Sequence, residues 1–199
     1  MKRFVQFLGA ATLLLSFTQC SEDATTDSAP SVQGSVKLTA SINETRTELS
    51  GNDVLWKSND CLGLFCGTKF VNAPFTTTAG GTTSADFTGD PTDPSGSEAE
   101  VFYAYYPYSA HAVLEGSVVS GLSIPAVQTF ATKSFATELC PMATSGADYS
   151  RLAFRTIGTV LKFQVTGQKN VTKIELTGNN GEALAGDYTI DFVGETPEM

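Results

Sequence analysis

Apolar and polar residues alternate strictly over residues 36–42. Val36, Leu38, Ala40 and Ile42 are apolar, and the residues between them are Lys, Thr and Ser. A period of two places all the apolar side chains on one face of an extended chain. We therefore predict a half-buried β-strand at residues 36–42.

Further short apolar or aromatic runs follow at close spacing, separated by Gly, Pro and Asn. They predict strands at residues 54–56, 61–66, 101–108, 152–154, 158–165, 171–176 and 188–192, around Phe70, Phe75 and Phe87, and an extended segment at 124–128. Residues 88–99 have the composition of a loop. No segment keeps a helical period over three turns. This pattern favours an all-β sandwich.

Tyrosines crowd the predicted strand at residues 101–108, at positions 103, 105, 106 and 108. Such a run suggests a platform on which carbohydrate stacks. Alternation along a strand, however, sends these rings to two opposite faces. We therefore interpret at least half of them as core residues, and expect Pro107 to end the strand.

The N-terminus has the layout of an export signal. Lys2 and Arg3 precede an apolar run from Phe4 to Phe17, and Cys20 follows. The run is shorter than the roughly 20 apolar residues that span a bilayer. Residues 1–19 resemble a bacterial lipoprotein signal, although Gln19 replaces the usual small residue. We predict that Cys20 carries the lipid; the alternatives are ordinary secretion and an N-terminal helical anchor.

Composition divides the rest of the chain. Residues 20–33 are rich in Ser, Thr and Asp and predict a flexible tether. Residues 34–194 hold the predicted strands and form the expected domain. Residues 195–199 are expected to begin a linker to a further, C-terminal domain.

Charge and residue types narrow the function classes. The chain has 12 Lys and Arg against 21 Asp and Glu, a net charge of −9. This balance argues against a nucleic-acid partner, which needs a basic footprint. His111 is the single histidine, so a catalytic Ser-His-Asp triad would depend on this one residue as its general base. We expect no enzyme activity and no cofactor.

The remaining cysteines and acids favour structural roles. Beyond Cys20 the chain has three cysteines, Cys61, Cys66 and Cys140. An odd number cannot all pair in disulfides within the chain, and their spacing matches no zinc-binding motif. Cys61 and Cys66 should point to opposite faces of a strand, and we interpret all three as buried thiols, with one bridge to Cys140 as the alternative. The aspartates of residues 86–93 suggest a Ca²⁺ site, but solvated loop acids explain them better.

An ordered set of motifs resembles the Bacteroides fimbrillin family. The matching segments are Val36–Ile42, Thr45–Thr47, Val54–Asp60, Leu62–Phe65, Phe102–Tyr108, Ile124–Gln128, Pro141–Met142, Leu152–Phe154, Gly158–Val165, Ile174–Gly178 and Ala185–Gly186. The resemblance covers almost all of the chain after the signal. It implies a transthyretin-like Greek-key β-sandwich, the first of two such domains.

The resemblance also implies a function. Members of the family are subunits of type V pili and related surface lipoproteins, anchored in the outer membrane by lipid and assembled by proteolytic trimming and strand exchange between neighbouring subunits. Arg46 is then the candidate processing site, and the alternative is a solvated residue at a strand end. The alternative function is a monomeric surface lipoprotein that binds a glycan or a host protein receptor.

Overall fold

The computed structural model describes residues 34–42, 54–128, 130–131, 134–135, 140–158, 166–167, 175, 177–181, 183–194 and 197–199. They belong to one compact unit, Gln33–Met199. All regular structure among these residues is β-strand, which confirms the all-β prediction.

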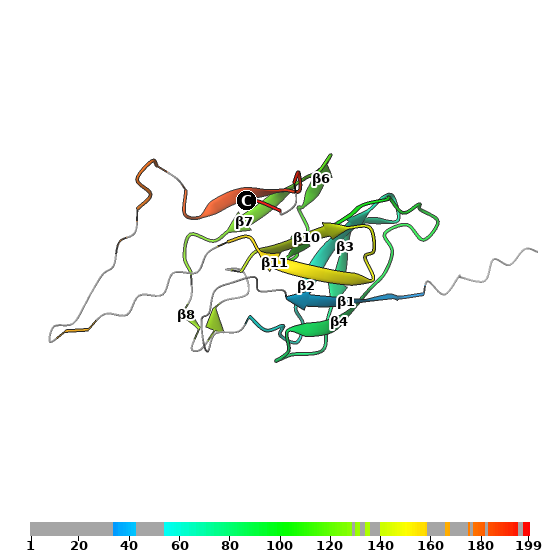
Figure 1. Ribbon diagram of the computed structural model, residues 1–199, viewed down its shortest axis with the longest axis horizontal. Coiled ribbons are helices and arrows are strands. Elements are labelled where there is room, and N and C mark those ends of the chain that lie inside the picture. The colour runs from blue at the N-terminus through cyan, green and yellow to red at the C-terminus, as the bar shows by residue number, and fades with distance from the viewer. Residues whose placement is uncertain are drawn as a thin grey trace, which may run out of the picture. The chain divides into compact units, whose positions relative to one another are not determined.

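Seven strands close into a barrel (Figure 1). In the order in which they pair, they are β1 (Val36–Ile42), β11 (Arg151–Thr156), β10 (Met142–Gly146), β5 (Phe102–Tyr106), β2 (Cys61–Cys66), β3 (Phe70–Thr76) and β4 (Ser84–Gly89). β4 pairs in turn with β1 and completes the ring. A closed ring of this kind leaves no free edge strand.

One barrel pairing differs from the others. β1 runs antiparallel to β4, with Leu38 opposite Phe87, but parallel to β11, with Ala40 opposite Leu152. The other described barrel pairings are antiparallel. Parallel neighbours cannot be joined by a hairpin, so β1 meets β11 only through a connection that includes the rest of the barrel.

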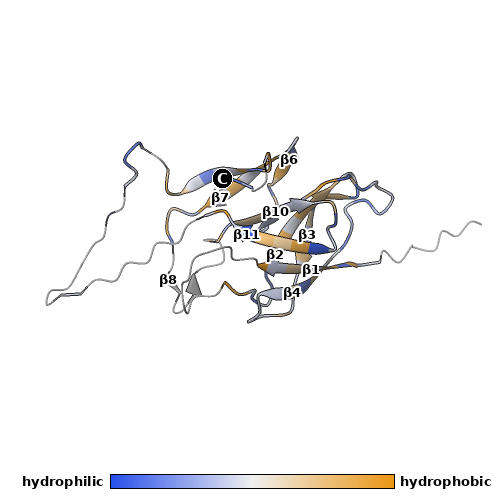
Figure 2. Cartoon of the chain, viewed as in Figure 1, coloured by the Kyte–Doolittle hydropathy of each residue, from blue (hydrophilic) through white to orange (hydrophobic). Residues whose placement is uncertain are grey.

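The barrel interior is filled by side chains at alternate strand positions. Its largest fully buried members are Leu38, Trp56, Leu62, Leu64, Phe70, Phe75, Phe87, Met142, Leu152 and Phe154. Trp56 makes edge-to-face contacts with Phe87, Tyr106 and Phe154, at centroid distances of 5.0, 5.3 and 5.7 Å. Figure 2 shows hydrophobic residues gathered in these strands.

A three-stranded sheet lies over part of the barrel exterior. It consists of β12 (Gly186–Asp191), β7 (Val118–Ile124) and β6 (Val113–Glu115). Val119, Leu122 and Ile190 from this sheet pack against Phe65 and Tyr105 of the barrel and form a second apolar cluster. A separate pair, β8 (Phe130–Ala131) and β9 (Ser134–Phe135), completes the described strands.

The strands confirm part of the expected architecture. The predicted strands at 36–42, 61–66 and 101–108 are present, the last ending at a cis Tyr106–Pro107 bond. The prediction of a strand at 54–56 was wrong. This segment forms only an isolated bridge between Trp56 and Thr82, because the chain turns directly afterwards, at Ser58 and Asn59. A two-sheet sandwich is not confirmed, because β1 closes the larger sheet into a barrel. Predicted strands 158–165 and 171–176 lie almost wholly outside the described residues.

Candidate functional site

β1 is held from both sides and from within. Its neighbours bind its backbone, including Thr39 N–H to the Ser150 carbonyl at 2.9 Å and Ile42 N–H to the Thr83 carbonyl at 2.8 Å. The indole Nε1 of Trp56 donates to the Ala40 carbonyl at 3.1 Å. β1 is therefore the strand that closes the barrel between β4 and β11.

The inner face of β1 is a row of small and medium apolar side chains. Leu38, Ala40 and Ile42 are 1%, 0% and 7% exposed and belong to the barrel core. Withdrawal of β1 would leave two unpaired strand edges and a groove with room for three apolar side chains. Unpaired edges of this kind accept another strand readily.

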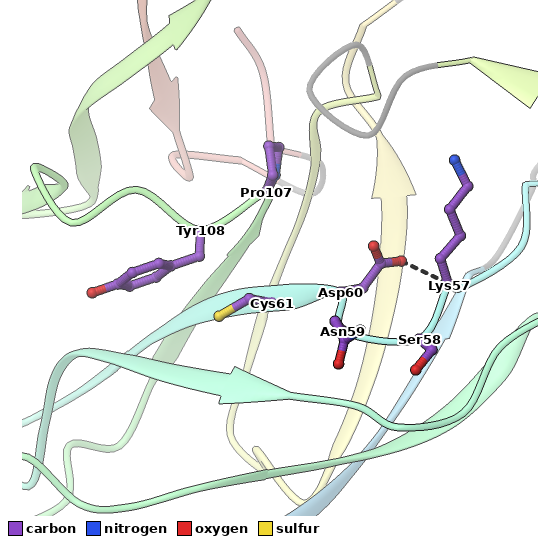
Figure 3. A pocket seen from close by; sticks show the side chains of 7 residues that line it. All are labelled: Lys57, Ser58, Asn59, Asp60, Cys61, Pro107 and Tyr108. Atoms are coloured by element: carbon purple, nitrogen blue, oxygen red, sulfur yellow. Dashed lines mark hydrogen bonds between the residues drawn. The ribbon is translucent and has the colours of Figure 1, made fainter. Parts of the chain in front are cut away.

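A second feature is an open pocket of about 330 Å³ beside the turn that precedes β2 (Figure 3). It is lined by Lys57, Ser58, Asn59, Asp60, Cys61, Pro107 and Tyr108. The Asp60 carboxylate accepts the Lys57 backbone N–H at 2.7 Å and the Tyr106 hydroxyl at 2.9 Å. Both of its oxygens are thus engaged in holding the turn, which suits a structural role better than acid–base chemistry.

Cys61 lies at the edge of this pocket, whereas Cys66 lies in the barrel core, which confirms that the two point to opposite faces. Burial raises the pKa of the Cys61 thiol, opposed in part by the Phe75 backbone and reinforced by the Asp60 carboxylate. A raised pKa keeps the thiol protonated and weakly nucleophilic. Among the described residues, Cys61, Cys66 and Cys140 form no disulfide; Cys66 and Cys140 are buried, and Cys61 is half-buried.

The tyrosines of residues 103–108 divide between the two apolar clusters. Tyr106 points into the barrel, and Tyr105 into the second cluster, where burial raises its pKa. The Tyr105 hydroxyl donates to Asn72 Oδ1 at 2.7 Å or to the Ser109 carbonyl at 2.9 Å. Tyr103 and Tyr108 are half-buried against the same cluster. The core interpretation is confirmed, and these rings do not form an exposed platform.

The aspartates at 86 and 93 are engaged in local bonds. Asp86 pairs with Lys37 at 2.7 Å, and the Thr39 hydroxyl donates to it at 2.9 Å; both hold the pKa of the Asp86 carboxyl below its usual range. Asp93 accepts from the backbone and hydroxyl of Ser95 within its turn. In the described parts of the chain, no three metal-ligating side chains converge.

Lys37 and Asp86 also border a groove of about 560 Å³ over β3, β4 and β1, which the sequence analysis missed. The groove is otherwise rich in hydroxyls, from Thr39, Thr76, Thr78, Thr82, Ser84 and Thr88. Only the pairing register brings these residues together, and β1 and β4 are far apart in the sequence. Alternating Thr and Ser residues on the predicted strands were the one sequence signal for this groove. Such alternation does not indicate which strands are neighbours.

The two residues predicted to carry function, Cys20 and Arg46, lie outside the described residues. His111 is exposed in the turn before β6. Within the described residues, no helix is long and apolar enough to cross a membrane.

Comparisons with protein-family models, with curated proteins and with solved structures found no match to this chain.

Proposed function

We propose that this protein is a structural and adhesive subunit of a cell-surface pilus, delivered as a lipid-anchored precursor and assembled by strand exchange. The observation that carries the proposal is β1: an N-terminal strand that buries Leu38, Ala40 and Ile42 and is bonded along both edges. The ordered motifs that resemble the fimbrillin family support this proposal. They also support a transthyretin-like Greek-key relationship for the fold.

The barrel connections favour β1 as the exchanged strand. The other six strands, β11, β10, β5, β2, β3 and β4, remain a continuous antiparallel sheet when β1 is removed. Because β1 is the first strand along the described chain, a cut after it releases the strand without breaking any connection among the others. A strand from a neighbouring subunit can then take its place through backbone hydrogen bonds and matching apolar side chains.

Trimming should open the barrel. We expect Arg-specific proteolysis at Arg46 of the native full chain to allow uptake of a labelled peptide with the sequence of residues 36–42, measured by co-migration in electrophoresis without boiling. The Arg46→Gln variant is the control and should take up no peptide. A peptide with Leu38→Asp should also fail, because it would bury a carboxylate in the core.

Subunits that carry a donor strand should in the same assay give a ladder that resists SDS. Trimmed protein that binds neither peptide nor neighbour would rule out strand exchange.

Anchoring is tested separately. We expect Cys20→Ser to abolish surface display, measured by protease accessibility on intact cells, while the soluble domain keeps its far-UV circular dichroism spectrum. Stable anchoring requires acyl chains, and only the cysteine thiol accepts them at this position. The Ser21→Ala variant is the matched control. Undiminished display of the Cys20→Ser variant would contradict the lipoprotein assignment.

A further inference from the structure

The exterior of β4, β1 and β11 forms one polar face, whose side chains alternate with those of the core. Its rows across the strands are set by register: Asp86 lies opposite Thr39, and Thr39 lies opposite Arg151. The neighbouring row joins Ser84, Ser41 and Ala153 by the same pairings. We call this surface, together with Lys37, Thr88 and Arg155, the β1 face.

Positive charge gathers on the β1 face although the whole chain has a net charge of −9. Of the five basic residues in the described part of the chain, three lie here: Lys37, Arg151 and Arg155. Asp86 is the acid within the face. Its carboxylate already forms an ion pair with Lys37 and accepts a hydrogen bond from the Thr39 hydroxyl. Asp148 borders the face and accepts the Ser150 backbone N–H at 2.9 Å. Hydrogen bonds from Ser150 lower the pKa of the Asp148 carboxyl most, and nearby Arg151 lowers it further.

The two arginines are available for a ligand. Arg151 and Arg155 are exposed, two strand positions either side of Ala153, and neither forms an ion pair with any described residue. A guanidinium binds carboxylate or sulfate groups through paired, charge-assisted hydrogen bonds. The face therefore offers two anion-binding groups at one side of β1.

Hydroxyl groups occupy the other side. The groove of about 560 Å³ begins at the β1 face and continues over β4 to β3, with Thr76 paired across from Thr88. No aromatic or large aliphatic side chain lines it. A protein partner would need such an apolar centre, whereas a ligand rich in hydroxyls would not.

We propose that the β1 face, while β1 is in place, binds an acidic polysaccharide. Sugar hydroxyls lie against the Thr and Ser side chains of the groove, and a carboxylate or sulfate of the same chain reaches Arg151, with Arg155 next along β11. The distance from β4 to β11 is two strand spacings, about 10 Å, which suits a disaccharide repeat. A nucleic acid is disfavoured because no aromatic side chain lines the groove on which its bases could stack.

The binding test uses the native, untrimmed full chain, so its outcome does not depend on strand exchange. The probes are a sulfated heparin oligosaccharide, a polyuronate oligosaccharide, a neutral dextran oligosaccharide of equal length and a poly-glutamate peptide, measured by calorimetry. We expect the acidic oligosaccharides to bind, more weakly as salt increases, and the neutral one not to bind.

Substitutions locate the site. Arg151→Gln should weaken binding of the acidic oligosaccharides about tenfold, because a charge-assisted hydrogen bond is lost. Lys69→Gln is the matched control: it removes the same charge at the turn between β2 and β3, outside the β1 face and the groove, and should leave affinity unchanged. Equal loss in both variants would mean non-specific attraction and overturn the proposal. So would equally tight binding of poly-glutamate, which would indicate an acidic protein segment as the partner.

Discussion

Replacing Trp56 by Ala is expected to lower the free energy of unfolding by about 3–5 kcal/mol. The indole is 1% exposed, touches three aromatic rings and donates to the Ala40 carbonyl of β1. The substitution removes a large core volume and leaves that carbonyl with one donor fewer. Because a domain of this size is stable by about 5–15 kcal/mol, urea unfolding followed by circular dichroism should show a large decrease in midpoint.

Leu55 provides the neighbouring control. Its side chain is 40% exposed, so Leu55→Ala should change the free energy of unfolding by about 0.5 kcal/mol or less. Trp56→Phe should lie between the two, because it keeps an aromatic ring but loses the hydrogen bond to β1. A Trp56→Ala variant as stable as Leu55→Ala would mean that the indole does not hold the barrel together.

Gly63→Val should destabilise the protein by about 3 kcal/mol. A Cβ atom on Gly63 would lie 2.5 Å from Cζ and 2.7 Å from the hydroxyl oxygen of Tyr105, its partner across β2 and β5. The ring cannot easily move aside, because its hydroxyl is bonded at Asn72 and Ser109. Thermal unfolding should show a clearly lower Tm.

A double-mutant cycle shows whether the ring is the cause. Gly63→Ala should cost less in a Tyr105→Ala background than in the native protein, because the added methyl group then enters vacated space. Gly34→Ala is the glycine control, since a Cβ there meets nothing within 4 Å. Additive effects of the two substitutions would show that backbone preference, rather than the ring, requires glycine.

Local pattern predicted the strands with clear alternation. The period of two in residues 36–42 predicted which side chains of β1 point into the barrel. The same rule predicted that Tyr105 and Tyr106, and likewise Cys61 and Cys66, lie on opposite faces of their strands. β6, β7, β8, β9 and β10 were missed. β6, β8 and β9 are only two or three residues long, a Ser-Gly pair interrupts the apolar residues of β7, and β10 has one large apolar residue, so packing against neighbouring strands, rather than a clear alternation, makes them strands.

Closure of the barrel could not be predicted from the sequence. It depends on pairing between β1 and β11, and nothing in either strand specifies the other as a parallel neighbour. The same non-local register creates the β1 face, since Asp86, Thr39 and Arg151 come from three distant segments. The candidate surface therefore became visible only with the structure, whereas the proposed lipidation and processing residues, Cys20 and Arg46, were predicted from the sequence alone.

The parallel pairing of β1 also sets an order of events during folding. Ser41 bonds the carbonyl of Leu152, a partner 111 residues further along the chain. Contacts of such long range form slowly, because much of the chain must be ordered first. The first of the described strands to be synthesised thus gains one of its two neighbours late. Until β11 is in place, one edge of β1 has no partner and can accept another strand.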